Sequence, residues 1–190
     1  MQRIEPNGFK KYGIFDQGCY TSKEKDTVSL LSTVVIAGVA TNQANTFEHI
    51  VPINLSSMFT GYGPLSAVTA TQNQVGNWDS AGQTRTVLLS DGSSTQELLT
   101  KYEYPKYFSY TISDFTGIIR FLATSVNGDW FFSSDARGKT SIKWRYAFNA
   151  KSVLAVPVLW LITKVLWRGY MQKALSIAVA QVEGKATQFS

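Results

Sequence analysis

Short runs of β-branched and aromatic residues, separated by glycine, proline and aspartate, dominate the chain from residue 30 to residue 148. Such runs are typical of strands bounded by turns. We expect seven strands, at 30–39, 67–75, 83–90, 95–104, 107–113, 118–132 and 140–148. The last six follow one another with short connections, which favour antiparallel neighbours. The pattern therefore predicts one antiparallel sheet.

Two of these runs alternate strictly between apolar and polar residues. Their apolar positions are Phe108, Tyr110, Ile112, Ile142, Trp144, Tyr146 and Phe148. A period of two with an opposite polar face predicts a sheet that is covered on one side and wet on the other. Trp144 would then face the covered side, either as core filler or as one flat wall of a pocket.

The C-terminal segment, at about 153–183, has a different period. Its apolar residues recur at spacings of three and four, at Ile162, Leu166, Tyr170, Ala174 and Ile177. This spacing predicts one long amphipathic helix that covers the sheet. Pro157 is acceptable because it lies near the helix start. A long helix across a bent sheet leaves a wedge of space, which either side chains or a ligand must fill.

Two shorter helices are predicted between the first two strands. Thr41 or Asn42 can cap a helix that ends at about Ile50, before Pro52, and a second helical turn spans 54–59. The sum is an α+β domain at 28–190, preceded by a polar N-terminal extension at 1–27. The length of 190 residues, 44% of them hydrophobic, fits one domain with a sizeable core.

Charge and cysteine content exclude several classes of protein. The net charge is +5, but the basic residues are scattered, so we expect no nucleic-acid partner. Cys19 is the single cysteine, which rules out an intrachain disulfide and is compatible with the cytoplasm. The N-terminus lacks the apolar region of a signal peptide. The longest apolar run, at 153–162, is short for a transmembrane segment and contains Pro157, although contact with a membrane surface stays open.

Catalytic and metal-binding motifs are missing from the sequence. His49 is the single histidine and there is no pair of cysteines, so we predict no metal site and no cofactor. The chain has no phosphate-binding glycine loop and no nucleophile elbow. No residue is therefore assigned a catalytic role.

Arg85 and Glu97 are the most informative charges. Arg85 shares a strand face with Val87 and Leu89, which favours the covered side. A two-residue turn at 91–92 would pair Arg85 with Leu98 and leave Glu97 in solvent, as the apolar pattern of the next strand favours. A three-residue loop with Gly92 in the left-handed region would pair Arg85 with Glu97 on one face. Such a pair could be a structural ion pair, or it could hold a ligand head or act as acid and base.

The ordered set of motifs carries a resemblance. It consists of Arg85-x-Val87-x-Leu89-x-Asp91-Gly92 with Glu97, then Phe108-x-Tyr110-x-Ile112, Trp130-x-Phe132, and the alternating run at 138–148. Over about residues 31–184 the chain resembles the helix-grip fold of the START/Bet v 1-like, or SRPBCC, superfamily, and within it the polyketide cyclase/dehydrase and lipid-transport group. The resemblance implies a cavity between the sheet and the long helix, gated by the loops at 61–64 and 90–93.

Members of that superfamily bind lipids, sterols, plant hormones, quinones or polyketides, and some catalyse cyclisation or dehydration. In related receptors the glutamate matching Glu97 points into the cavity, which opposes the expectation from the apolar pattern. The candidate cavity-lining residues are Arg85, Val87, Leu89, Glu97, Phe108, Tyr110, Ile112, Trp144, Tyr146, Ile162, Leu166 and Tyr170.

Three functions follow as hypotheses. The first is a non-catalytic carrier or sensor of a small hydrophobic ligand. The second is a cyclase or dehydratase that uses Arg85, Glu97, Tyr110 or Tyr146 in a dry pocket, which requires Glu97 to point inward. The third is an interaction module with a filled core, in which the apolar stretch at 153–162 contacts a partner or a membrane surface. A cavity below about 300 Å³ would favour the third.

Overall fold

The structure is a computed structural model that describes residues 31–184. The predicted extension at 1–27 lies outside the described residues, and so do residues 28–30 and 185–190 of the predicted domain. The domain boundary at residue 28 therefore stays a prediction.

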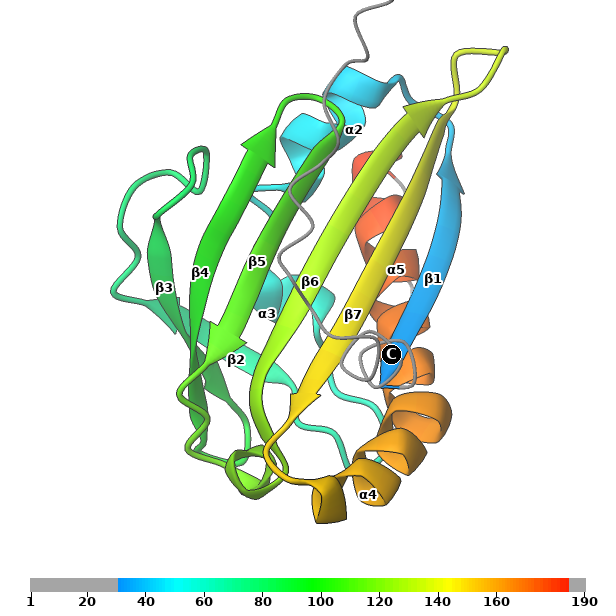
Figure 1. The fold of residues 1–190 in the computed structure, drawn as a ribbon. Helices are drawn as coiled ribbons and strands as arrows, with labels where there is room; N and C mark the ends of the chain where they lie inside the picture. The colour runs from blue at the N-terminus through cyan, green and yellow to red at the C-terminus, as the bar shows by residue number, and fades with distance from the viewer. Residues whose placement is uncertain (1–30, 185–190) are drawn as a thin grey trace, which may run out of the picture.

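Seven antiparallel strands form one curved sheet in the order β1-β7-β6-β5-β4-β3-β2 (Figure 1). The strands are β1 (Ser32–Val39), β2 (Val68–Gln72), β3 (Thr84–Leu89), β4 (Ser94–Glu103), β5 (Tyr107–Ser113), β6 (Ala123–Ser134) and β7 (Thr140–Ala150). This confirms the predicted antiparallel sheet. The strand predicted at 118–132 begins later, because its first residues form a short 3₁₀ turn, η1 (Ile118–Phe121).

Two short helices, α2 (Gln43–Ile50) and α3 (Leu55–Met58), join β1 to β2. The Asn42 side chain accepts a hydrogen bond from the backbone N–H of Asn45 at 2.9 Å, so Asn42, not Thr41, is the cap of α2. Asn54 caps α3 in the same way through the N–H of Ser56. Both helices begin where a side-chain oxygen satisfies free backbone N–H groups, which was predicted for α2 but not for α3.

One continuous helical segment ends the described chain. It consists of η2 (Val153–Ala155), α4 (Val156–Leu161), the π-helical η3 (Ile162–Trp167) and α5 (Arg168–Val182). Pro157 lies in the first turn of α4, as predicted. Figure 1 shows the segment lying along one face of the sheet, with α5 beside β1.

The buried stripe of this segment differs from the prediction in its first half. Ile162 and Leu166 were expected to face the sheet, but both are only partly buried. The residues that pack inward fall one position later: Thr163 is fully buried, Trp167 packs against the core, and the stripe continues through Met171. A π-helical turn holds more residues than an α-helical turn, so η3 shifts the stripe in phase.

The same segment is long and apolar enough to cross a membrane, judged by length and composition alone. Val153–Val182 has 30 residues and an 18-residue window of mean hydropathy 1.3, of which 22% is buried. The prediction from the sequence considered only the apolar run at 153–162, which is too short to cross a membrane, and not the whole helix. Within α5, however, Met171, Ala174 and Ala178 are fully buried against the sheet.

Stacked aromatic rings fill the domain on the covered face of β5, β6 and β7. Trp144 and Trp130 stack with centroids 4.4 Å apart, and Phe108 lies against Trp130 at 5.6 Å. From α2, Phe47 meets the edge of this stack at Phe132. The alternating residues of β5 and β7 therefore build a solid core at this end of the sheet.

Candidate functional site

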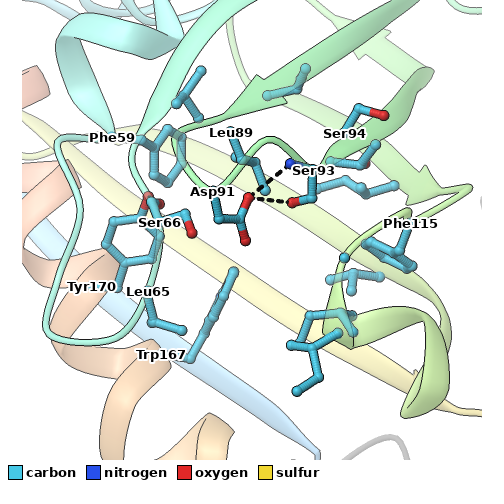
Figure 2. A pocket seen from close by; sticks show the side chains of 18 of the residues that line it. Phe59, Leu65, Ser66, Leu89, Asp91, Ser93, Ser94, Phe115, Trp167 and Tyr170 are labelled. Carbon is cyan, nitrogen blue, oxygen red and sulfur yellow. Dashed lines mark hydrogen bonds between the residues drawn. The ribbon is translucent and has the colours of Figure 1, made fainter.

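A pocket lies between the sheet and the helical segment (Figure 2). Its mouth is bordered by the loop at 61–66, by the hairpin between β3 and β4, and by the segment that leads into η1. Its inner wall is mostly apolar and includes Phe59, Val68, Val126 and Phe148. The cavity volume is about 170 Å³, which lies below the 300 Å³ at which drug-sized ligand pockets usually begin.

Half of the candidate residues line this pocket, namely Val87, Leu89, Glu97, Ile112, Tyr146 and Tyr170. Whether they bind a ligand stays a prediction. The other half lie elsewhere, and the reasons differ.

Phe108, Tyr110 and Trp144 belong to the packed core instead of the pocket lining. Trp144 is fully buried against Trp130, so of its two readings the structure supports core filler. Tyr110 occupies the space above Gly128 on the neighbouring strand, where a Cβ atom would collide with its ring. The stacked rings leave no open wall at these positions.

Ile162 and Leu166 were predicted to line the cavity but do not, for a different reason. The phase shift of η3 turns them away from the pocket, and Trp167 lines it in their place. Phe148 was also missed as a lining residue, although its place on the same face as Tyr146 could have identified it.

The hairpin between β3 and β4 decides the orientation of Glu97. The Leu89 N–H donates to the Ser93 carbonyl at 2.8 Å, which closes a three-residue loop with Gly92 at φ +80°. Arg85 therefore pairs directly with Glu97. The expectation from the apolar pattern was wrong, because Glu97 is buried and Leu98 is exposed. The inward glutamate that the resemblance implied is confirmed.

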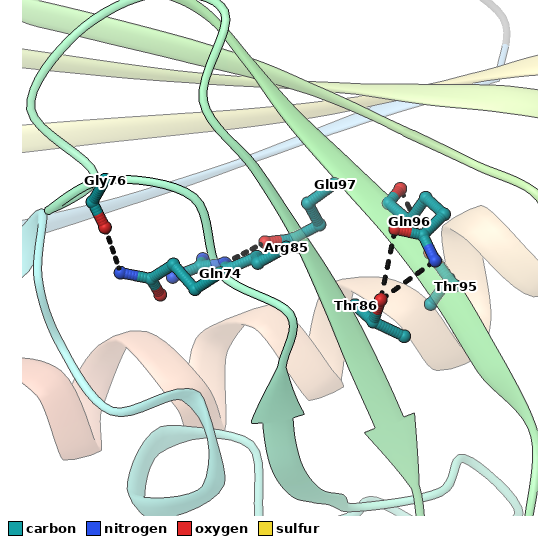
Figure 3. A network of polar contacts seen from close by, with 7 residues as sticks. All are labelled: Gln74, Gly76, Arg85, Thr86, Thr95, Gln96 and Glu97. Atoms are coloured by element: carbon teal, nitrogen blue, oxygen red, sulfur yellow. Dashed lines mark hydrogen bonds and ion pairs between the residues drawn. The ribbon is translucent and has the colours of Figure 1, made fainter.

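Arg85 and Glu97 form a buried ion pair (Figure 3). The Arg85 Nε donates to Glu97 Oε2 at 2.7 Å, and the two side chains are 7% and 8% exposed. The Arg85 guanidinium also lies over the Trp78 ring, 4.0 Å from its centroid. Arg85 is held by these two contacts, and of the pair only Glu97 lines the pocket.

Trp78 was missed by the sequence analysis. It is almost fully buried, although it lies in the polar loop between β2 and β3 and has φ +63°. A large aromatic residue among glycine, asparagine and aspartate is the one signal that could have identified it.

Burial controls the protonation of the tyrosines around the inner wall. Burial raises the pKa of Tyr110, and the negative charge of Glu97 raises it further. The pKa of Tyr146 is raised by burial first, then by Tyr110 and Glu97. Both hydroxyls are therefore neutral and can donate hydrogen bonds at physiological pH. Burial also raises the pKa of Tyr170, whose hydroxyl donates to the Ser66 carbonyl at 2.6 Å.

Two ordered loops form the mouth of the pocket. Asp91 Oδ1 accepts hydrogen bonds from the Ser93 backbone N–H at 2.9 Å and from the Ser93 hydroxyl at 2.6 Å, and these bonds lower the pKa of Asp91. On the other side, Lys173 Nζ donates to the Gly61 carbonyl at 3.0 Å. The Tyr62 ring lies so close over Gly169 that a side chain there would displace it.

Neither metal ligation nor histidine chemistry is supported at this site. Residues 31–184 contain no group of three or more histidine, cysteine, aspartate or glutamate side chains that could hold a metal ion. His49 is exposed on α2, where its Nδ1 pairs with the Asn45 carbonyl at 2.8 Å, and it does not line the pocket.

Comparison by sequence finds no relative. No protein-family model matches the chain, and no curated protein matches it.

Comparison by structure gives many matches. Norcoclaurine synthase from Thalictrum flavum, a point mutant with a transition-state analogue, has a TM-score of 0.59 at 10% identity, over 80% of this chain and 95% of that one. Ara h 8.0201 has a TM-score of 0.54 at 15% identity, over 81% and 98%. The di-domain ARO/CYC protein BexL, from the BE-7585A biosynthetic pathway, has a TM-score of 0.61 at 14% identity, over 86% and 55%.

The chain has the SRPBCC fold. This START/Bet v 1-like, helix-grip architecture is the one that the order of motifs predicted. The SRPBCC fold is shared here by a synthase and by Ara h 8.0201, so the fold alone leaves open whether this chain is an enzyme.

Proposed function

We propose that the chain binds a small, mostly apolar molecule and does not change it chemically. The observation that carries this proposal is Glu97, a buried carboxylate that lines a pocket with a mostly apolar inner wall and is paired with Arg85. A neutralised carboxylate in such a wall accepts hydrogen bonds and thereby fixes the orientation of a ligand. A suitable ligand carries one hydroxyl or N–H donor at its buried end.

The volume of the pocket limits the size of that buried end. Apolar cavities of roughly 150 Å³ hold a molecule of the size of benzene. A cavity of about 170 Å³ therefore suits a single ring or a short branched chain. Among the classes considered, a phenolic or quinol-like head fits best, with any longer apolar tail leaving between the loops of the mouth. A complete lipid or polyketide exceeds the cavity.

The proposal is tested first by native mass spectrometry of the purified protein, followed by denaturation and solvent extraction. A specific small molecule bound in a one-to-one ratio is the expected result. Next, calorimetric titration compares phenols with their methyl ethers, which lack the donor. Loss of the donor should weaken binding by about ten-fold or more, since it removes the hydrogen bond that the ligand would donate to Glu97.

Two variants provide a matched control for the location of the site. Leu89→Trp places a large ring at the mouth and should abolish phenol binding, because Leu89 lines the pocket. Val165→Trp makes the same kind of change on an exposed position of η3 and should leave binding unchanged. Equal binding by both variants would contradict the proposed pocket.

A filled-core interaction module is the second candidate, and the small cavity volume favours it. Failure of the protein to retain or bind any phenol, quinol or hydrophobic dye would support that candidate. The cyclase or dehydratase hypothesis requires Glu97 to point inward, and this requirement is met. However, Glu97 is already paired with Arg85, and the raised pKa values of Tyr110 and Tyr146 make these neutral tyrosines weak proton donors as well as poor bases.

A further inference from the structure

One end of the molecule carries a concentration of exposed apolar side chains, which we name the apolar end. It consists of Ile118, Phe121, Val153, Leu154, Val158 and Leu161. Val153 is 86% exposed and Leu154 is 88% exposed, so these two side chains protrude almost completely from the surface. Large apolar side chains gathered in this way are unusual on a protein surface without a binding role.

The parts of the apolar end lie next to each other in space although they are distant in sequence. Ala123 of β6 pairs with Ala150 of β7, and the Lys151 N–H donates to the Leu122 carbonyl at 2.8 Å. The turn η1 immediately precedes this contact and η2 immediately follows it. Figure 1 shows this end of β6 and β7 close to α4.

The apolar end adjoins the mouth of the pocket. Ile118 is 75% exposed and also lines the pocket, together with Ile119. A surface that covers the apolar end would therefore also cover or border the opening of the pocket.

Charge around the apolar end favours an anionic partner. From residue 150 to residue 182, the stretch that contains the helical segment, the sequence has four lysine and arginine residues and no aspartate or glutamate. Lys151 and Arg120 lie at the apolar end itself, where Lys151 Nζ donates to the Arg120 carbonyl at 3.1 Å. Asp91 and Asp114 follow β3 and β5 at the same end of the sheet, so the positive charge is concentrated on the side of the helix.

We propose that the apolar end docks on the surface of an anionic lipid membrane, with Val153 and Leu154 inserted among the acyl chains. Single protruding side chains suit a fluid lipid layer, which needs no complementary pocket, and flanking cations add attraction to anionic headgroups. Trp160, which is partly exposed on α4, has the amphipathic ring that favours the membrane interface. In this orientation the pocket would exchange its ligand with the lipid phase.

Flotation with lipid vesicles tests the proposal. The full-length protein is mixed with vesicles of phosphatidylcholine alone or with about 30% phosphatidylglycerol, whose charge should attract the basic flank. We expect binding to the anionic vesicles, and binding that weakens as salt is added. The Val153→Asp/Leu154→Asp variant should bind at least about ten-fold more weakly, because two inserted side chains become charged.

Ile36→Asp is the matched control, because Ile36 is 68% exposed on β1, away from the apolar end. It should bind vesicles as the unaltered protein does. Circular dichroism and the unfolding midpoint show whether the double variant is folded. If it is not folded, the single variant Leu154→Asn replaces it in the flotation experiment.

Two results would overturn the proposal. One is unaltered vesicle binding by the folded double variant or by Leu154→Asn. The other is failure of the unaltered protein to float with anionic vesicles. In that case sedimentation velocity shows whether the unaltered protein forms a dimer that the double variant does not form. Loss of such a dimer would mean that the apolar end binds a second copy of the chain and not a membrane. No ligand takes part in these experiments, so their outcome is independent of the proposed function.

Discussion

The buried Arg85–Glu97 pair should show a large energetic coupling when each partner is removed in turn. Glu97→Leu leaves the Arg85 guanidinium buried without its carboxylate, and Arg85→Met leaves the carboxylate buried without its cation. Breaking a buried pair from one side costs about 3–5 kcal/mol, whereas replacing both partners with apolar residues is often close to neutral. Since the pair is joined at 2.7 Å and both side chains are under a tenth exposed, we expect each single variant to fall in that range.

The double variant, Arg85→Met/Glu97→Leu, should be more stable than either single variant. Part of the loss remains, because the stacking of Arg85 on Trp78 is worth about 0.5–2 kcal/mol and is lost with the guanidinium. The two single losses together exceed this remaining loss by at least about 4 kcal/mol, which is the expected coupling energy. Urea unfolding followed by tryptophan fluorescence, with linear extrapolation to water, gives the four free energies of unfolding.

The chain contains a matched control in Arg145 and Asp129. This pair also joins an arginine Nε to a carboxylate oxygen, at 3.0 Å, but its arginine side chain is 44% exposed. The same cycle at this pair should give a coupling of about 0.2–1 kcal/mol. The reasoning is refuted if the coupling at Arg85–Glu97 does not exceed that at Arg145–Asp129.

Three further predictions concern the core and the tyrosines. Trp144→Ala should lower the free energy of unfolding by about 3–5 kcal/mol, because this ring is completely buried; a change in ligand affinity at unchanged stability would place it in the pocket wall instead. Gly128→Ala should destabilise the fold by about 1–3 kcal/mol in urea unfolding, because its Cβ would collide with Tyr110, whereas Gly38→Ala meets open space and should be nearly neutral. Burial raises the pKa of Tyr107 to about 12, against an unfolded value near 10. Stability should therefore be constant below pH 10 and fall as the pH rises from there towards 12, while tyrosinate absorbance shows a late-titrating class; full ionisation near pH 10 in the folded protein would contradict this.

The order of the elements could be predicted because each depends on a local pattern. Alternation in β5 and β7 and the side-chain cap at Asn42 are local signals, and the structure confirms them. The order of strands in the sheet then follows from short antiparallel connections, with β1 closing beside β7.

The orientation of Glu97 could not be predicted from the alternation of its own strand. Amphipathicity favoured Leu98 as the inward residue, but the loop closed by Gly92 shifts the register by one position. A one-residue shift exchanges the two faces of a strand, so the conformation of a single glycine outweighs several apolar side chains. Trp78 was missed because its burial depends on the path of the loop between β2 and β3, which no periodic pattern in the sequence describes.

The wider turn η3 has a consequence for how the helical segment can vary. Each residue of an α-helix advances about 100° around the axis, so one extra residue rotates everything before it by about that angle relative to α5. Removal of one residue from Ile162–Trp167 would rotate Val158 and Leu161 about the helix axis, so that they point in a different direction, while the contacts of α5 stay in place. The same rotation would turn Leu159, which is completely buried, away from the core, so η3 fixes both the buried and the exposed face of α4.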